Sequence, residues 1–116
     1  MNDSPSTMEL AHIERDNEGF LLDPEDWNRG VAQALAAEAG LELTDAHWQV
    51  IDFIRDSFET SQVVPEARKL LRHLKSTLGA EQATRRYVYH LFPTGYGQTA
   101  CKIAGMRKPL KLMLDV

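Results

Sequence analysis

The chain has very little cysteine, since Cys101 is the only one among its 116 residues. A single thiol excludes a disulfide within the chain and any zinc or iron–sulfur site built on a cysteine cluster. It does not exclude thiol chemistry, because one cysteine in a reducing compartment can act as a nucleophile, a persulfide carrier or a mixed-disulfide partner. Cys101 is therefore the first residue to consider as a functional site.

Long apolar runs are absent as well. No stretch approaches the length that a helix needs to span a bilayer, and the polar segment from Met1 to Thr7 lacks the charged-then-apolar pattern of a signal peptide. Apolar residues make up 43% of the chain and charged residues 26%, which is ordinary for one globular domain. These features predict a cytoplasmic protein with no membrane association.

Patterns for metal or cofactor binding are also missing. The segment Gly95-Tyr96-Gly97 lacks the Lys and Ser/Thr of a phosphate-binding loop. The four histidines lie in separate segments, with no pair four residues apart: His12, His47, His73 and His90. We therefore expect no metal and no cofactor, and we expect His47 to pack or cap beside Thr44.

Charge is distributed unevenly along the chain. Residues 1–61 contain 3 Lys/Arg and 14 Asp/Glu, a net charge of −11, whereas residues 62–116 contain 10 Lys/Arg and 3 Asp/Glu, a net charge of +7. One interpretation is that the thiol belongs to a basic region suited to acidic partners. The other is that the two halves form ion pairs with each other in the fold.

Apolar spacing and turn residues predict a mainly helical domain. Residues 1–7 are expected to be a disordered tail, residues 8–22 a small β-hairpin around a polar turn, and residues 106–116 a C-terminal arm. Gly40, Gly79 and Gly105 are placed to end helices. The predicted helices cover about residues 23–39, 44–60, 65–78, 80–91 and 98–104. Short helices joined by tight turns also suggest a helix-turn-helix-like bundle.

Several collinear motifs resemble those of the DsrC/TusE family of sulfur-relay proteins, which includes the sulfite reductase gamma subunit. The segment Gln98-Thr99-Ala100-Cys101-Lys102-Ile103-Ala104-Gly105-Met106-Arg107-Lys108-Pro109 resembles the family's C-terminal motif A-C-x-x-A-G-x-x-K-P. Four further matches lie upstream: residues 18–21 with E-G-Y-L, 43–48 with L-T-x-x-H-W, 65–68 with P-x-x-R, and 86–95 with an aromatic segment leading into L-F-P-x-G.

The resemblance implies an orthogonal helical bundle over residues 8–105, with a short N-terminal β-hairpin and a mobile C-terminal arm. It also implies a sulfur-relay or persulfide carrier in sulfur metabolism or tRNA 2-thiolation. Expected partners are dissimilatory sulfite reductase or sulfurtransferases of the Tus or DsrEFH type. The family's second cysteine lies eleven residues after the first, where this chain has Leu112. The chain is therefore a variant that lacks the C-terminal cysteine.

Two interpretations of Cys101 follow. In the first, the thiol is partly exposed and somewhat acidified by Lys102, Arg107 and Lys108, and it forms a persulfide or an intermolecular disulfide. In the second, it packs inertly between Ala100 and Ile103, as free cysteines often do.

Three functions remain open. The first is sulfur transfer through Cys101, by a carrier more than by an enzyme with its own pocket; an enzyme of this kind would be a sulfurtransferase. The second is a regulatory member that binds sulfur-pathway partners, or DNA through the basic segment 65–75, without carrying sulfur. Overall acidity weighs against DNA. The third is an unrelated enzyme, which ranks last. The apolar end of the arm also permits a homodimer.

Overall fold

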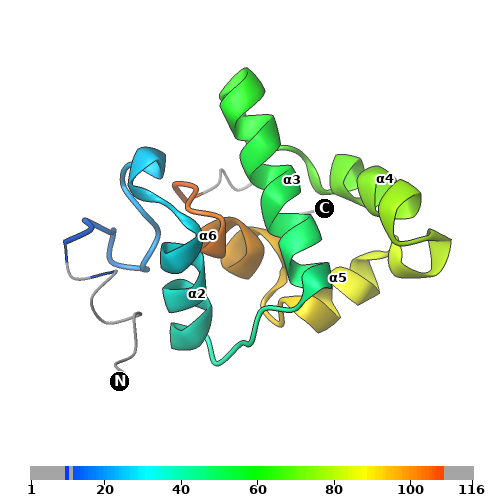
Figure 1. Ribbon diagram of the computed structural model, residues 1–116, viewed down its shortest axis with the longest axis horizontal. Coiled ribbons are helices and arrows are strands. Elements are labelled where there is room, and N and C mark those ends of the chain that lie inside the picture. The colour runs from blue at the N-terminus through cyan, green and yellow to red at the C-terminus, as the bar shows by residue number, and fades with distance from the viewer. Residues whose placement is uncertain (1–9, 11, 109–116) are drawn as a thin grey trace.

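The computed structural model describes Leu10 and residues 12–108, and this part of the chain is mainly helical, as predicted. It contains five α-helices and three further helical turns that are not α-helical (Figure 1). The helices are α2 (Arg29–Glu38), α3 (Asp45–Ser61), α4 (Ala67–Thr77), α5 (Arg85–Leu91) and α6 (Cys101–Ile103); the turns are η1 (Pro24–Asp26), η2 (Ala80–Gln82) and the π-helical η3 (Tyr96–Ala100). The expected tail 1–7 and most of the expected arm lie outside the described residues.

The prediction of an N-terminal β-hairpin is wrong for the described residues. Only one isolated antiparallel bridge forms, between Arg15 and Leu21. The turn between them is closed by the Asp16 carboxylate, which accepts the backbone N–H groups of Glu18 and Phe20 at 2.8 and 2.9 Å. Phe20 and Leu21 are consecutive and both fully buried, whereas neighbouring residues of a strand point to opposite faces. The segment is thus a turn anchored in the core rather than a strand pair.

Two of the predicted helices are each divided by a capping residue. Asn28 accepts the Val31 N–H at 2.9 Å and starts α2, so the first predicted helix separates into η1 and α2. Thr84 accepts the Tyr87 N–H at 3.1 Å and starts α5 after η2. Such side chains compete with the helix for backbone N–H groups and therefore favour a new N-terminus over continuation.

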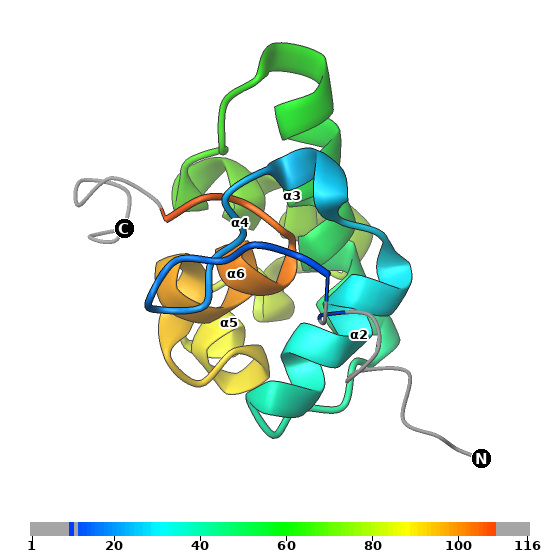
Figure 2. The ribbon, with the colours of Figure 1, turned by 90° about the vertical axis from the view of Figure 1, so that its left-hand side faces the viewer.

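Helix α6 lies in the interior, between α2 and α3 (Figures 1 and 2). The buried face of α3 supplies Val50, Ile51 and Ile54, and α4 packs against α3 from the other side. The N-terminal turn passes across α6, with Gly19 beside the Lys102 side chain. The C-terminal motif found in the sequence is therefore placed at the centre of the core.

Among the described residues, no helix has the length and apolar character required to cross a membrane.

Candidate functional site: the buried thiol of Cys101

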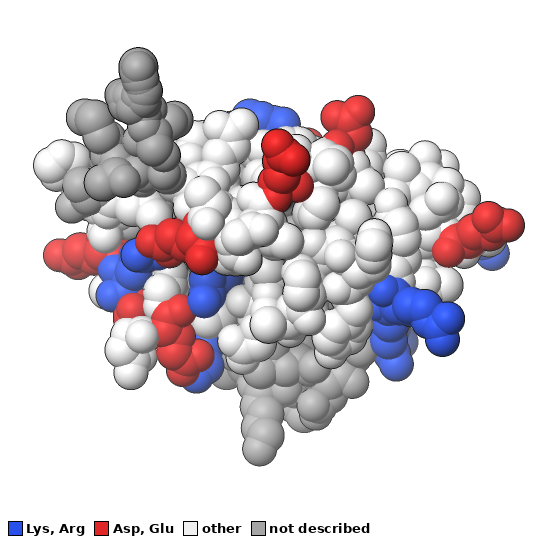
Figure 3. All heavy atoms as spheres, turned by 90° about the horizontal axis from the view of Figure 1, so that it is seen from below, with Lys and Arg blue, Asp and Glu red and all other residues white. Residues whose placement is uncertain are grey.

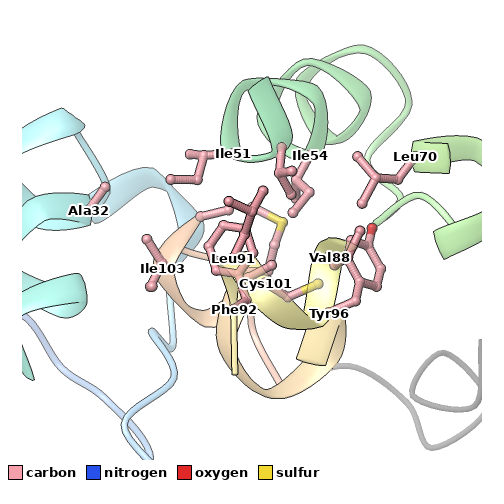
Figure 4. Packing of buried hydrophobic residues seen from close by; sticks show 14 of the residues in the cluster. Ala32, Ile51, Ile54, Leu70, Val88, Leu91, Phe92, Tyr96, Cys101 and Ile103 are labelled. Atoms are coloured by element: carbon pink, nitrogen blue, oxygen red, sulfur yellow. The ribbon is translucent and has the colours of Figure 1, made fainter. Parts of the chain in front are cut away.

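Cys101 is the first residue of α6 and directly follows the π-helical turn η3. Turns of this type are rare and occur frequently at functional sites. The cysteine is free and fully buried, with 0% of its surface exposed. Figure 4 shows it between Tyr96 on one side and Leu91 and Phe92 on the other. The thiol is enclosed by apolar side chains from several elements.

This burial controls the ionisation of the thiol. Removal from water raises the pKa of Cys101 to about 12, because a thiolate is poorly solvated in an apolar environment. A hydrogen bond with Tyr96 acts in the opposite direction and offsets part of the increase. The Tyr96 hydroxyl also donates to the Pro65 carbonyl oxygen, and burial raises the pKa of Tyr96 as well.

The prediction of a partly exposed, acidified thiol is wrong for this conformation. The cations expected to acidify Cys101 are directed elsewhere: the Lys102 ammonium lies 5.1 Å from the centre of the Phe20 ring, and Lys108 pairs with Glu18 at 2.5 Å. Exposed Arg107 follows the buried Met106. Without a nearby positive charge, desolvation determines the pKa of the thiol.

Trp27 and Arg55 hold the C-terminal end of α6, and we call them, with Gly105, the Trp27–Arg55 cluster. The Trp27 indole N–H donates to the Ile103 carbonyl at 2.8 Å. The Arg55 guanidinium donates to the carbonyls of Ala104 and Pro24, each at 3.1 Å, and lies 4.5 Å from the centre of the Trp27 ring. The bonds to Ile103 and Ala104 satisfy carbonyls at the end of α6 that would otherwise be buried without partners.

Gly105 completes this cluster through its backbone. Its φ of +80° allows the chain to turn back, so that the N–H groups of Gly105 and Met106 donate to the carbonyls of Lys102 and Cys101 at 3.0 Å each. A Cβ at this position would lie 2.4 Å from Cδ1 of Trp27. These backbone hydrogen bonds therefore hold the chain against the core immediately after α6.

Arg55 was not predicted from the sequence. It lies on the apolar face of α3, one turn after Ile51, and only 8% of it is exposed. A charged residue at a core position of an otherwise apolar helix face is the signal that could have indicated it. The prediction for His47 is confirmed: its Nδ1 accepts the Thr44 N–H at 3.0 Å, and its Nε2 therefore carries the hydrogen that is donated to the Leu91 carbonyl at 2.8 Å.

The part of the chain that the structure describes contains no group of three or more His, Cys, Asp or Glu side chains that could hold a metal ion.

Comparison with known proteins places this site in a family. A family model described as DsrC like protein matches residues 7–113. The chain belongs to the DsrC-like family. It is 42% identical over 101 residues to the sulfurtransferase TusE homolog of Haemophilus influenzae, covering 87% of this chain and 93% of the relative. It is 38% identical over 103 residues to the sulfurtransferase TusE of Salmonella typhimurium, covering 89% and 94%.

Solved structures give the same family. The oxidized gamma subunit of dissimilatory sulfite reductase (DsrC) from Archaeoglobus fulgidus matches with a TM-score of 0.79 at 39% identity, covering 84% of this chain and 90% of that one. DsrC of Allochromatium vinosum matches with a TM-score of 0.74 at 40% identity, covering 84% and 88%. The sulfur-relay family predicted from the motifs is thus confirmed, and these names give no support to the DNA-binding alternative.

Proposed function

We propose that this DsrC-like chain is a sulfur-relay protein in which Cys101 accepts and hands on sulfane sulfur, and that the resting protein keeps this thiol closed. The observation that carries the proposal is the position of Cys101. It is the one thiol of the sequence, it occupies the family's motif, and it lies at the start of α6 in contact with Tyr96. Its neighbours hold it neutral until the cover is opened.

The transfer step conserves electrons. The Cys101 thiolate attacks the outer sulfur of a donor persulfide, the donor S–S bond breaks, and a new S–S bond forms on Cys101. The donor leaves as its thiolate, and the proton of Cys101 passes to solvent or to a base of the donor protein. No external oxidant or reductant is needed. In the second transfer, an acceptor thiolate attacks the outer sulfur of the Cys101 persulfide, and Cys101 leaves as its thiolate.

Because the site is closed, Cys101 can react only after its sulfur becomes accessible to solvent. With its pKa near 12, Cys101 is almost entirely protonated at neutral pH, and thiols react as thiolates. Solvation of the sulfur requires α6 or Tyr96 to move. The protein would thereby be inert toward free persulfides and oxidants and would react when a partner displaces the covering side chains.

The test combines a persulfide donor with intact-protein mass spectrometry. The protein is incubated with glutathione persulfide and, separately, with a persulfidated sulfurtransferase. We expect little addition to the native protein from the small donor, and addition of one sulfur when the protein donor is used or when the fold is loosened by urea. Cys101→Ser is the control and should gain none. Absence of sulfur on Cys101 in every arm would contradict the carrier role.

A second candidate is a partner-binding member of the family that carries no sulfur. The complete burial of Cys101 favours this candidate, because a buried free cysteine can serve as a small apolar core residue without reacting. It predicts binding to the same sulfurtransferase without any mass increase, and equal binding by Cys101→Ser. Measuring both quantities in one experiment separates the two functions.

The remaining proposals concern context. We infer a cytoplasmic location, a domain over residues 8–105 followed by an arm, and partners among Tus- or DsrEFH-type sulfurtransferases or dissimilatory sulfite reductase. The supporting observations are the names of the relatives and structural neighbours. We regard the chain as a carrier and protein partner more than an enzyme with its own pocket. Size-exclusion chromatography with light scattering tests for a homodimer.

A further inference from the structure

A shallow apolar groove lies between α4 and α5, at the outer edge of the core. It has a cavity volume of only about 20 Å³ and is lined by Ala67, Leu70, Leu71, Arg85, Val88, Tyr89 and Tyr96. Tyr89 is 54% exposed and is one of three large apolar side chains exposed in the described residues. The groove thus offers apolar surface next to a single lining cation.

Further cations stand beside this groove. Arg68 and Lys75 are exposed on α4 at three residues before and four residues after Leu71, which places them next to it on the helix surface. Arg86 is exposed beside Arg85 at the start of α5. Residues 64–96 contain six Lys/Arg and two Asp/Glu, a net charge of +4. Figure 3 shows Lys and Arg side chains projecting at the end of the molecule where α4 and α5 lie.

The described carboxylates do not neutralise this surface. Among the described residues, five ion pairs form, and three of them join residues of the acidic half to each other: Arg15–Glu38, Arg29–Asp52 and Arg55–Glu59. Only Lys108–Glu18 joins the two halves. Lys75, Arg85 and Arg86 form no ion pair with any described carboxylate, and Arg68 pairs only with neighbouring Glu66. Pairing between the halves therefore does not account for the basic charge.

The geometry points to the groove between α4 and α5 as the docking site for an acidic segment of a partner protein. A large apolar side chain of that segment packs over the surface formed by Leu71, Val88 and Tyr89, and its flanking carboxylates lie near Arg85 and Lys75. The apolar contact supplies affinity, and the charges supply orientation and a fast encounter. This inference is independent of whether Cys101 carries sulfur.

The site has a structural connection to the thiol. Tyr96 lines the groove, and its hydroxyl contacts Cys101 and Pro65. A side chain that packs over the groove therefore contacts the residue that also covers Cys101. Occupation of the groove is therefore expected to change the rate at which Cys101 is alkylated.

A displayed library of random twelve-residue peptides, selected on the immobilised full chain, tests the docking site. We expect the enriched peptides to combine several Asp/Glu with one or two large apolar residues, and to shift the amide resonances of Leu71, Val88 and Tyr89. Arg85→Glu and Tyr89→Ala should each weaken binding about tenfold or more. Lys69→Glu is the matched control, because Lys69 lies on the opposite side of α4 from Leu71, and it should change binding little.

Several results would overturn the inference. Enriched peptides that are neutral or basic, peptides that map to another surface, or failure to enrich any peptide would each do so. Circular dichroism of the variants shows whether a loss of binding is a loss of fold. Duplex DNA or a second copy of this chain that binds this face more tightly than the selected peptides, at physiological salt, would assign the surface to that ligand instead.

Discussion

The two sides of Cys101 are built differently. On the side of α2 and α3, the Trp27–Arg55 cluster holds the end of α6 with directed hydrogen bonds to the carbonyls of Ile103 and Ala104. On the side of α4 and α5, one tyrosine separates the thiol from an apolar groove that reaches the surface. The first side is held by several directed polar contacts, whereas the second is held mainly by apolar packing around Tyr96.

This difference indicates how the buried thiol becomes accessible. Breaking the Trp27–Arg55 cluster leaves buried hydrogen-bonding groups without partners, which costs free energy. Displacing the Tyr96 ring breaks few polar contacts, and the groove beside it opens to the surface. A partner is therefore expected to reach Cys101 from the α4–α5 side, while the other side keeps α6 in place. Four substitutions or conditions test this contrast.

The largest effect is expected from Gly105→Ala. The new Cβ would lie 2.4 Å from Trp27 Cδ1 at a residue with a φ of +80°, so steric overlap adds to backbone strain and the free energy of unfolding should fall by about 3–4 kcal/mol. Gly40→Ala is the control: its φ is +73° but nothing lies within 4 Å, so only about 1 kcal/mol should be lost. Urea unfolding measures both; equal losses would show that the Trp27 contact is unimportant.

Arg55→Leu should have the next largest effect. It leaves the Ala104 carbonyl without its donor and removes one of the two donors to the Pro24 carbonyl, and we expect a loss of about 2 kcal/mol together with faster alkylation of Cys101. Arg29→Leu serves as the comparison, because Arg29 is exposed and forms a surface ion pair with Asp52, worth under about 1 kcal/mol. Unchanged alkylation in the Arg55 variant would separate this cluster from the accessibility of the thiol.

Tyr96→Phe tests the other side with a smaller change. It removes the hydroxyl that donates to Pro65 and contacts Cys101, and the free energy of unfolding should fall by about 1 kcal/mol. Since that hydrogen bond lowers the pKa of the thiol, its loss should move the pH profile of Cys101 alkylation to higher pH. A profile that moves to lower pH would contradict the assigned role of the tyrosine.

The smallest effect is expected from titration of His47, which connects the start of α3 to the end of α5. Burial lowers the pKa of His47 below its ordinary value of 6.5, so the fold favours the neutral ring. Its contribution to stability is present above pH 6.5 and is lost as the pH falls from there through the folded pKa. The free energy of unfolding is measured at pH 7.5 and 5.5 for the native chain and for His47→Gln. It should depend less on pH in the variant.

Local sequence features predicted much of the fold. Thr44 starts α3, Gly79 and Gly105 have positive φ at the ends of their helices, and the apolar spacing of Leu70 and Leu74 identifies the buried face of α4. The splits at Asn28 and Thr84 were missed because each cap lies inside an otherwise helical pattern. The β-hairpin was wrong because two adjacent buried residues, Phe20 and Leu21, were taken for part of a strand.

The sequence by itself determined the family and the identity of the single candidate thiol, because motifs and counts are properties of the chain alone. Only the tertiary structure decided the state of that thiol. Lys102 is adjacent to Cys101 in sequence, yet the helix directs its ammonium to Phe20, while Tyr96 and the core enclose the sulfur. The role of Arg55 likewise depends on carbonyls 31 and 49 residues away. Desolvation and long-range hydrogen bonds arise when distant segments pack, so the pKa of Cys101 is a property of the fold.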